Sequence, residues 1–295
     1  MIHAFNWQER IIMRTIKKIH QAESAPIADL ITYRALPTGS LDHIDPFLFL
    51  NHHGYQIYPP NNQGLPFGPH PHRGFETVTF ILKGDLAHKD SSGAESVIKE
   101  GGVQWMTAGK GLIHAEVSSE EFKKNGGELE ILQLWVNLPA KYKMVEPAYT
   151  GLAKQDIPSI ELDNGKVVID VVSGNWGGTN GAFTPLTDIQ LAVVRLDTGG
   201  NYKKAIPADR NIFFYVVKGK LMVNGQQAGI HGLVEFNHDD TAIEIQALED
   251  SIVLLGHALP FNEPIVAYGP FVMNSEEEIQ QAYEDYQQGL FGIWK

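Results

Sequence analysis

The chain has 295 residues, of which 43% are hydrophobic and 20% are charged, a composition typical of a globular protein that dissolves in water. Its formal net charge of −12 argues against nucleic acid and against an anionic membrane surface as direct partners, because both are bound through basic faces. No stretch approaches the apolar run that a membrane-spanning helix needs.

Cysteine is absent, so the sequence excludes disulfides, a thiolate nucleophile and zinc–sulfur sites. The N-terminal residues lack the basic-then-apolar layout of a secretory signal, and we expect a reducing compartment, the cytoplasm. The 12 histidines leave imidazole and carboxylate groups as the available metal ligands. These groups suit single transition-metal ions rather than clusters.

The first half of the chain has the pattern of short strands. Residues 75–82 alternate between two faces, and Lys83-Gly84-Asp85 is a turn signal that ends the run. Residues 131–138 form a second strand-like run. Residues 138–151 have no clear period and contain two prolines, and we interpret them as the start of a connection between two domains.

The second half repeats this style. Strands are predicted over residues 190–196, 212–218 and 252–255. Turns are predicted at Lys218-Gly219-Lys220 and at Asn224-Gly225, the latter being the strongest short signal for a hairpin. Two strand-rich halves of similar length predict a duplicated β-barrel or β-sandwich.

A helix is predicted only near the C-terminus. Ser275 and Glu278 have the spacing of a capping box, apolar residues then recur at helical spacing, and Gly289 is the predicted stop. The hydrophobic tail at residues 290–294 is expected to pack on the body of the protein.

Two pairs of potential metal ligands lie in predicted strands bounded by glycine. The first is His70-Pro71-His72 and the second is His114-Ala115-Glu116. Because residues two apart point to the same face of a strand, two such pairs on neighbouring strands could form one four-ligand site of nitrogen and oxygen atoms near a barrel mouth. Such a site leaves coordination positions open, as in a catalytic metal centre. A His-x-His pair by itself is a weak signal, and the second pair strengthens it.

These motifs resemble those of the cupin superfamily. The spacing Gly-x5-His-x-His-x3-Glu from Gly64 to Glu76 is similar to the first cupin motif, and Gly111-x2-His114 is similar to part of the second. The match departs from the usual pattern at Gly84, which comes one residue late, and at Gly109, which stands where proline is usual.

Longer strings narrow the resemblance to the pirin family within the cupins, and they are spread over nearly the whole chain. The strings are HPHRGFETVTFILKG, GGVQWMTAGKGLIHAE, LWVNLP and GPFVMNSEEEIQQAY. The resemblance implies an all-β fold of two cupin-type antiparallel β-barrels, a bicupin, with a short C-terminal helix. We assign residues 1–140 to an N-terminal, metal-binding barrel. Residues 141–295 are assigned to a C-terminal barrel without metal, ending in the helix and hydrophobic tail.

The resemblance also implies the ligand set. Carried over by motif position, His70, His72, His114 and Glu116 would hold one divalent transition metal. Fe²⁺ is the expected ion, and Mn, Co, Ni, Cu or Zn would also fit such a site. The second half has no His-x-His pair, and its histidines are scattered without carboxylates two residues on.

Glu76 remains an alternative to Glu116. Cupins in general use the glutamate of the first motif, which is Glu76 here, and strand parity puts Glu76 on the same inward face as His70 and His72. Parity therefore does not choose between the two carboxylates. We favour Glu116 on the pirin match and keep Glu76 as a supporting residue or an alternative ligand.

Three neighbouring features have simpler interpretations. His52 and His53, which stand where pirins commonly have an acidic residue, are expected in a loop. Arg73, on the outward parity, is expected either in a surface ion pair or as a guide for an anionic substrate. Trp105 is expected in the core rather than in a pocket wall.

Two functions follow from the resemblance. Pirins are similar to quercetin 2,3-dioxygenase, which opens the central ring of a flavonol with O₂ and releases carbon monoxide. In that hypothesis the partners are a small aromatic, flavonol-like substrate and O₂, and Glu116 is also the candidate base that takes the substrate's hydroxyl proton. The alternative is a non-catalytic, metal-dependent regulatory protein. We expect a monomer, because a two-barrel chain can close its own sheet edges.

Overall fold

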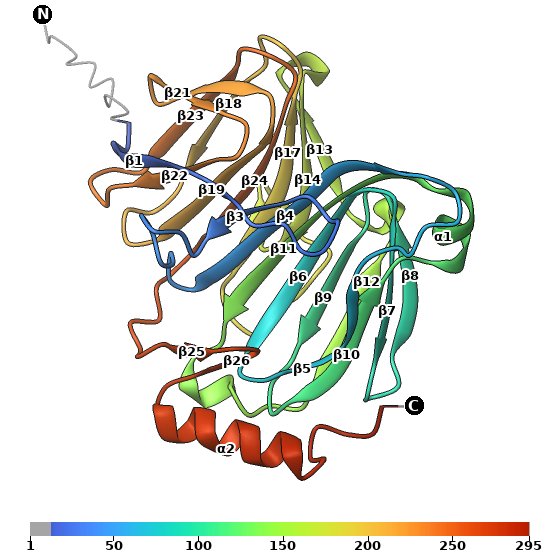
Figure 1. Ribbon diagram of the computed structural model, residues 1–295. Coiled ribbons are helices and arrows are strands. Elements are labelled where there is room, and N and C mark those ends of the chain that lie inside the picture. Colours follow the sequence, from blue (N-terminus) through green and yellow to red (C-terminus); the bar gives the residue numbers. More distant parts are fainter. Residues whose placement is uncertain (1–12, 295) are drawn as a thin grey trace, which may run out of the picture.

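Two antiparallel β-barrels lie against each other, and the C-terminal helix lies beside the first barrel (Figure 1). The structure is a computed structural model that describes residues 13–294. The N-terminal residues 1–12, which bear on the expected absence of a secretory signal, are outside this range. The predicted all-β architecture of two barrels and a short C-terminal helix is confirmed. None of the helices among the described residues is long and apolar enough to cross a membrane.

The first barrel consists of a seven-stranded sheet and a four-stranded sheet. The large sheet has the order β12 (Ala148–Leu152), β9 (Val103–Thr107), β6 (Phe75–Lys83), β11 (Gly127–Asn137), β4 (Phe47–Tyr58), β3 (Thr32–Leu36) and β2 (Glu23–Ser24). The small sheet has the order β5 (Phe67–His72), β10 (Leu112–Val117), β7 (Asp85–Asp90) and β8 (Glu95–Lys99). The expectation of a helix only near the C-terminus is wrong, because the short helix α1 (Glu120–Asn125), capped by the Ser119 side chain, joins β10 to β11.

The second barrel repeats this arrangement. Its large sheet has the order β1 (Ile16–Gln21), β22 (Gly232–Phe236), β19 (Asn211–Lys218), β24 (Ser251–Ala258), β17 (Gln190–Leu196), β14 (Val167–Ser173) and β13 (Ser159–Leu162). Its small sheet has the order β18 (Asn201–Ala205), β23 (Ala242–Ala247), β20 (Lys220–Val223) and β21 (Gln226–Gly229). The 3-10 helices η1 (Ala140–Tyr142), η2 (Lys154–Asp156) and η3 (Asp163–Gly165) lie between β11 and β14.

Two small ribbons complete the sheets. They are β15 (Asn175–Trp176) with β16 (Thr179–Asn180), and β25 (Val266–Tyr268) with β26 (Phe271–Met273). The second ribbon leads into the helix α2 (Glu276–Gln287). The predicted capping box is confirmed: Ser275 accepts a hydrogen bond from the backbone N–H of Glu278, and the Glu278 side chain accepts one from the backbone N–H of Ser275.

The large sheets of the two barrels pack face to face. One face of β6 carries Val78 and Phe80, which share a buried apolar cluster with Phe213 and Leu254 of the second barrel. The opposite face of β6 points into the first barrel. Because both faces are covered, every residue from Phe75 to Ile81 is buried. The interior of the second barrel is filled by its own apolar cluster, which includes Ile169, Val194 and Phe214.

Each terminal part of the chain packs on the barrel that is formed mainly by the other half of the sequence. The strand β1 pairs with β22 in the second barrel, whereas the C-terminal segment, residues 266–294, packs on the first (Figure 1). The strand β12 lies beyond the expected boundary at residue 140, yet it pairs with β9. The division at residues 140 and 141 stays a prediction, and strand pairing crosses it.

The expected packing of the hydrophobic tail is confirmed only for part of it. Phe291 is buried in a cluster with Phe271 and Ile279, but Leu290 and Ile293 are 62% and 73% exposed. The expectation of a surface ion pair for Arg73 is wrong. Its guanidinium is buried, lies 2.7 Å from the Asp285 carboxylate and stacks 4.6 Å from the centre of the Phe291 ring.

Asp285→Ala should lower the free energy of unfolding by about 2–3 kcal/mol, because it leaves the Arg73 guanidinium buried without its carboxylate partner. Urea unfolding of the full chain would measure this loss. The matched control is Glu284→Ala, which removes the same charge from the exposed side of α2. Equal effects of the two substitutions would show that the ion pair does not hold the helix in place.

Candidate metal centre

Three histidines meet at the edge of the small sheet of the first barrel. His70 and His114 are directly opposite each other in the pairing of β5 with β10, and His72 lies one step along the same face. The ring centres are 4.4 Å apart for His70 and His114, 4.8 Å for His70 and His72, and 4.9 Å for His72 and His114. One nitrogen from each ring lies within 4.8 Å of the others, so these three side chains could hold a metal ion.

Backbone carbonyls set the orientation of two of the rings. His70 donates from Nδ1 to the Gly68 carbonyl over 2.8 Å, and His72 donates from Nδ1 to the Pro270 carbonyl over 3.2 Å. In a neutral imidazole, each of these bonds places the ring proton on Nδ1. Nε2 then carries a free lone pair, which a metal ligand needs. Pro270 belongs to the C-terminal segment, so the end of the chain takes part in positioning a candidate ligand.

Three ring nitrogens of His72 and His114 are buried without a partner. Within the described part of the chain, Nε2 of His72 and both nitrogens of His114 have no hydrogen-bond partner, although both residues are buried. Burial lowers the pKa of His72 to about 3 and that of His114 well below its usual range, and neighbouring imidazoles add to both shifts. Neutral, unpaired imidazoles are the form that binds a metal, and unpaired buried nitrogens are otherwise costly, so the residues fit a metal ion.

Glu116 lies deeper in the barrel, two residues along β10 from His114. Its Oε1 accepts hydrogen bonds from Thr79 over 3.1 Å and from Gln104, and its Oε2 accepts one from Gln133. Its carboxylate falls in a second set of close ligand atoms, with His88 and His114. Metal–ligand bonds of about 2.0–2.2 Å would bring all ligand atoms within about 4.4 Å of one another. Glu116 must therefore approach His70 and His72 to share an ion with them.

His88 is a site residue that the motif analysis missed. It lies opposite Glu116 in the pairing of β10 with β7, its Nε2 is 3.0 Å from an Asp90 oxygen, and its ring stacks on Tyr149 at 3.8 Å. Its Nδ1 is buried and finds no hydrogen-bond partner among the residues that the structure describes. The alternation of residues 85–90 after the Gly84 turn is the signal that could have placed His88 inside the barrel.

The expectation that Glu76 shares the inward face with His70 and His72 is wrong. Gly74, with φ of +87°, separates β5 from β6, and the two strands belong to different sheets. The inward side chains of β6 are therefore odd-numbered, as shown by Thr79, which bonds Glu116. Glu76 is on the opposite face, where it accepts a hydrogen bond of 2.7 Å from Thr107.

Gly74 itself is required by a close approach to the C-terminal segment. A Cβ built on it would lie 2.0 Å from the carbonyl oxygen of Val272 in β26. Buried Lys143 joins the same elements, since its ammonium donates to the carbonyls of Gly74 and Val272 and to Oδ1 of Asn137. Burial lowers the pKa of Lys143 to about 8.

The expectation that His52 and His53 lie in a loop is also wrong, because both are buried in β4. His53 bonds the Thr32 hydroxyl over 2.9 Å, and His52 lies between Glu130 and the Tyr215 hydroxyl of the second barrel. Trp105 belongs to the shared core, as expected, and it also lines a cavity.

The two barrels and the buried histidine cluster define a bicupin, and comparisons with known proteins give its family. The pirin family model matches residues 29–136, and the model of the pirin C-terminal cupin domain matches residues 191–292. The chain belongs to the pirin family, as its motifs indicated.

Relatives cover most of the chain. A protein of Pseudomonas aeruginosa, named provisionally as a quercetin 2,3-dioxygenase, is 40% identical over 268 residues, which are 90% of this chain and 92% of the relative. A pirin-like protein of Caulobacter vibrioides is 38% identical over 260 residues, 88% of this chain and 91% of the relative.

Solved structures show the same fold. The crystal structure of a quercetin 2,3-dioxygenase from Acinetobacter baumannii matches with a TM-score of 0.89 and 35% identity, covering 95% of this chain and 99% of that one. A bacterial pirin from Escherichia coli, solved in complex with nickel(II), matches with a TM-score of 0.65 and 24% identity. The match covers 82% of this chain and 100% of that one.

His70→Ala and His114→Ala should each weaken metal binding by at least about tenfold, because even the loss of an outer-shell partner costs roughly 10–100-fold. Metal content after dialysis, measured by plasma mass spectrometry, checks this. Glu116→Gln should also lower metal content, whereas Glu76→Gln, the matched control on the other face of the sheet, should retain it. Metal retained in both histidine variants would contradict the assignment of the cluster.

Glu76 should make stability depend on pH. Burial raises its pKa from 4.5 to about 7, so the folded protein holds a proton that the unfolded chain releases. This contribution to the free energy of unfolding is complete below pH 4.5 and is lost as the pH rises through about 7. Its total is roughly 3 kcal/mol.

Glu76→Gln should remove this loss of stability at higher pH. In urea unfolding of the metal-free full chain, the variant should gain stability relative to the wild type between pH 5 and pH 8. A difference that does not change with pH would show that Glu76 titrates normally in the folded protein.

Proposed function

We propose that His70, His72, His114 and Glu116 hold one divalent transition metal, with Fe²⁺ as the expected ion. We further propose that this centre supports a flavonol 2,3-dioxygenase-type reaction. The observation that carries the proposal is the cluster of three imidazoles, in which His72 and His114 have buried ring nitrogens that no group of the described residues pairs. The relatives from P. aeruginosa and A. baumannii, whose names give quercetin 2,3-dioxygenase, support the choice of reaction.

A bound metal would supply a Lewis acid for the substrate's hydroxyl oxygen and, as iron or copper, exchange of electron density with O₂. The protein would supply the rest. His70 is the partly exposed member of the cluster, so the open side of the centre lies there. The substrate is expected to approach from that side.

An aromatic surface beside His72 suits a flat substrate. Trp135 lies 5.3 Å from His72, 4.4 Å from Phe75 and 4.5 Å from Phe49, measured between ring centres. Trp135 and Phe49 are both only half-buried. Phe49 and Phe75 pack on the Trp135 ring, and Arg34 lies 4.9 Å from the centre of the Phe49 ring. A flavonol next to the metal ligands would therefore contact the exposed edges of these rings.

The hydrogen bonds of Glu116 favour the role of ligand over that of base. Three donors fix the carboxylate and occupy most of its lone pairs, and a metal ion in the remaining position would leave none free to take a proton. For Glu116 to act as the base on the substrate's hydroxyl, one of these hydrogen bonds would have to open.

The deciding experiment is anaerobic reconstitution of the full chain with Fe, Mn, Co, Ni, Cu or Zn, followed by exposure to O₂ and quercetin. We expect consumption of quercetin with release of carbon monoxide in equal amounts for at least one metal, and none in His114→Ala. Metal binding without turnover for any ion would sink the dioxygenase proposal and favour the regulatory alternative. A monomer in the cytoplasm remains a prediction.

A further inference from the structure

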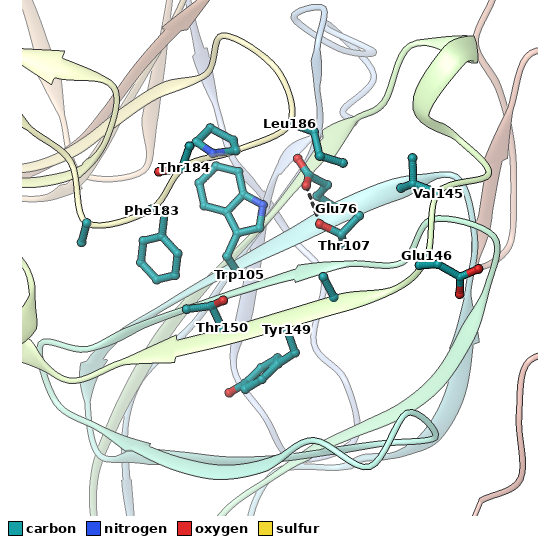
Figure 2. A pocket seen from close by; sticks show the side chains of 13 residues that line it. Glu76, Trp105, Thr107, Val145, Glu146, Tyr149, Thr150, Phe183, Thr184 and Leu186 are labelled. Carbon is teal, nitrogen blue, oxygen red and sulfur yellow. Dashed lines mark hydrogen bonds between the residues drawn. The ribbon is translucent and has the colours of Figure 1, made fainter.

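A cavity lies between the two barrels, outside the metal centre. It has a volume of about 520 Å³ and is lined by β6, β9 and β12 of the first barrel and by residues 182–186 of the second half (Figure 2). These strands turn their other face toward the metal ligands, so a molecule in this cavity would not contact them. A volume of this size is in the range of small-molecule sites.

Glu76 is an unpaired acid in the wall of this cavity. It is 1% exposed, and Oε1 accepts the hydrogen bond from Thr107. Among residues 13–294, Oε2 has no hydrogen-bond partner, and neither has the buried indole N–H of Trp105, which lies near enough to the carboxyl to oppose the rise in its pKa. No lysine, arginine or histidine is among the described residues that line the cavity. The other acid, Glu146, lies at the exposed rim and is paired with Lys110 over 2.6 Å. Glu76 therefore offers a buried acceptor that no cation of the protein neutralises.

Apart from Thr150 and Thr184, the remaining walls are aromatic and apolar. Trp105 and Phe183 face each other with ring centres 5.8 Å apart, and Leu186 adds to the lining, whereas the Tyr149 side chain points away from the cavity (Figure 2). An aromatic face next to a carboxylate attracts an organic cation, because the ring quadrupole and the acid both favour positive charge. An apolar body on that cation would be covered by Phe183 and Leu186.

We propose that this cavity binds a small organic amine, as a primary ammonium attached to a body about the size of one aromatic ring. The ammonium donates to Oε2 of Glu76 and lies near Trp105, and the body packs against Phe183. A neutral alcohol could also donate to Glu76, but it would leave the carboxylate's charge unpaired. The amine is preferred because a buried carboxylate without a counter-charge is costly.

The state of Glu76 fits this proposal. Burial raises its pKa to about 7, so near neutral pH a bound cation can hold the carboxyl in its ionised form. The proposal is independent of the proposed dioxygenase function, since it involves neither the metal ligands nor the substrate surface beside Trp135.

Calorimetric titration of the full chain tests the proposal with three probes of similar shape: 2-phenylethylammonium, 2-phenylethanol and phenylacetate. We expect saturable binding of the ammonium at one site and binding of the alcohol at least about tenfold weaker, as for loss of a charged hydrogen bond. Phenylacetate should not bind. Equal affinity for the ammonium and the alcohol, or no saturable binding of the ammonium, would overturn the proposal.

Variants locate the site. Glu76→Gln should weaken ammonium binding at least about tenfold, while the rim control Glu146→Gln should change it less than about twofold. Phe183→Ala should weaken both the ammonium and the alcohol, because it removes the apolar wall. A thermal melt of each variant confirms folding. Unchanged affinity in a folded Glu76→Gln variant would place the amine elsewhere and reject this cavity.

Discussion

Both faces of the strands β6 and β9 in the large sheet of the first barrel are buried, and the rest of the structure depends on this constraint. The inward face of β6, β9 and β11 carries Thr79, Gln104 and Gln133, which together surround the Glu116 carboxylate. The outward face of the same strands carries apolar side chains that pack on the second barrel. A shift of one residue in any of these strands would exchange polar ligand-holding groups for core residues, so the packing of the two barrels fixes the register on which the metal centre depends.

The C-terminal segment adds a second constraint, at the other side of the histidine cluster. The Pro270 carbonyl sets the proton on His72, and next to it Arg73 is held by Asp285 of α2. The His72–Pro270 contact joins residues 198 positions apart, so the centre is complete only when the C-terminal segment has packed on the first barrel. A change far from the histidines, in the ribbon or in α2, can therefore affect the ligand geometry.

The sequence predicted what local rules determine. Residues two apart within one strand share a face, and this placed His70 with His72 and brought His114 to them. The capping box at Ser275 and the hairpin at Asn224-Gly225, where both residues have positive φ, are likewise local and were predicted correctly. Glu76 was misplaced because parity was carried across Gly74, where the chain leaves one sheet for another. The partners of Arg73 and His52 come from distant parts of the chain, and no local pattern announces them.

Glu76 and Glu116 show how the fold assigns different roles to the same side chain. Glu116 meets three donors and stays next to imidazoles, whereas Glu76, which points out of the barrel from a strand of the other sheet, meets one hydroxyl and a mainly apolar wall. The second barrel, whose own interior is filled with apolar side chains, creates that wall through residues 182–186. The second barrel therefore acts on the metal centre and on Glu76 from outside the first barrel. It fixes the register of the ligand-bearing barrel and encloses a buried acid that a lone barrel would expose to water.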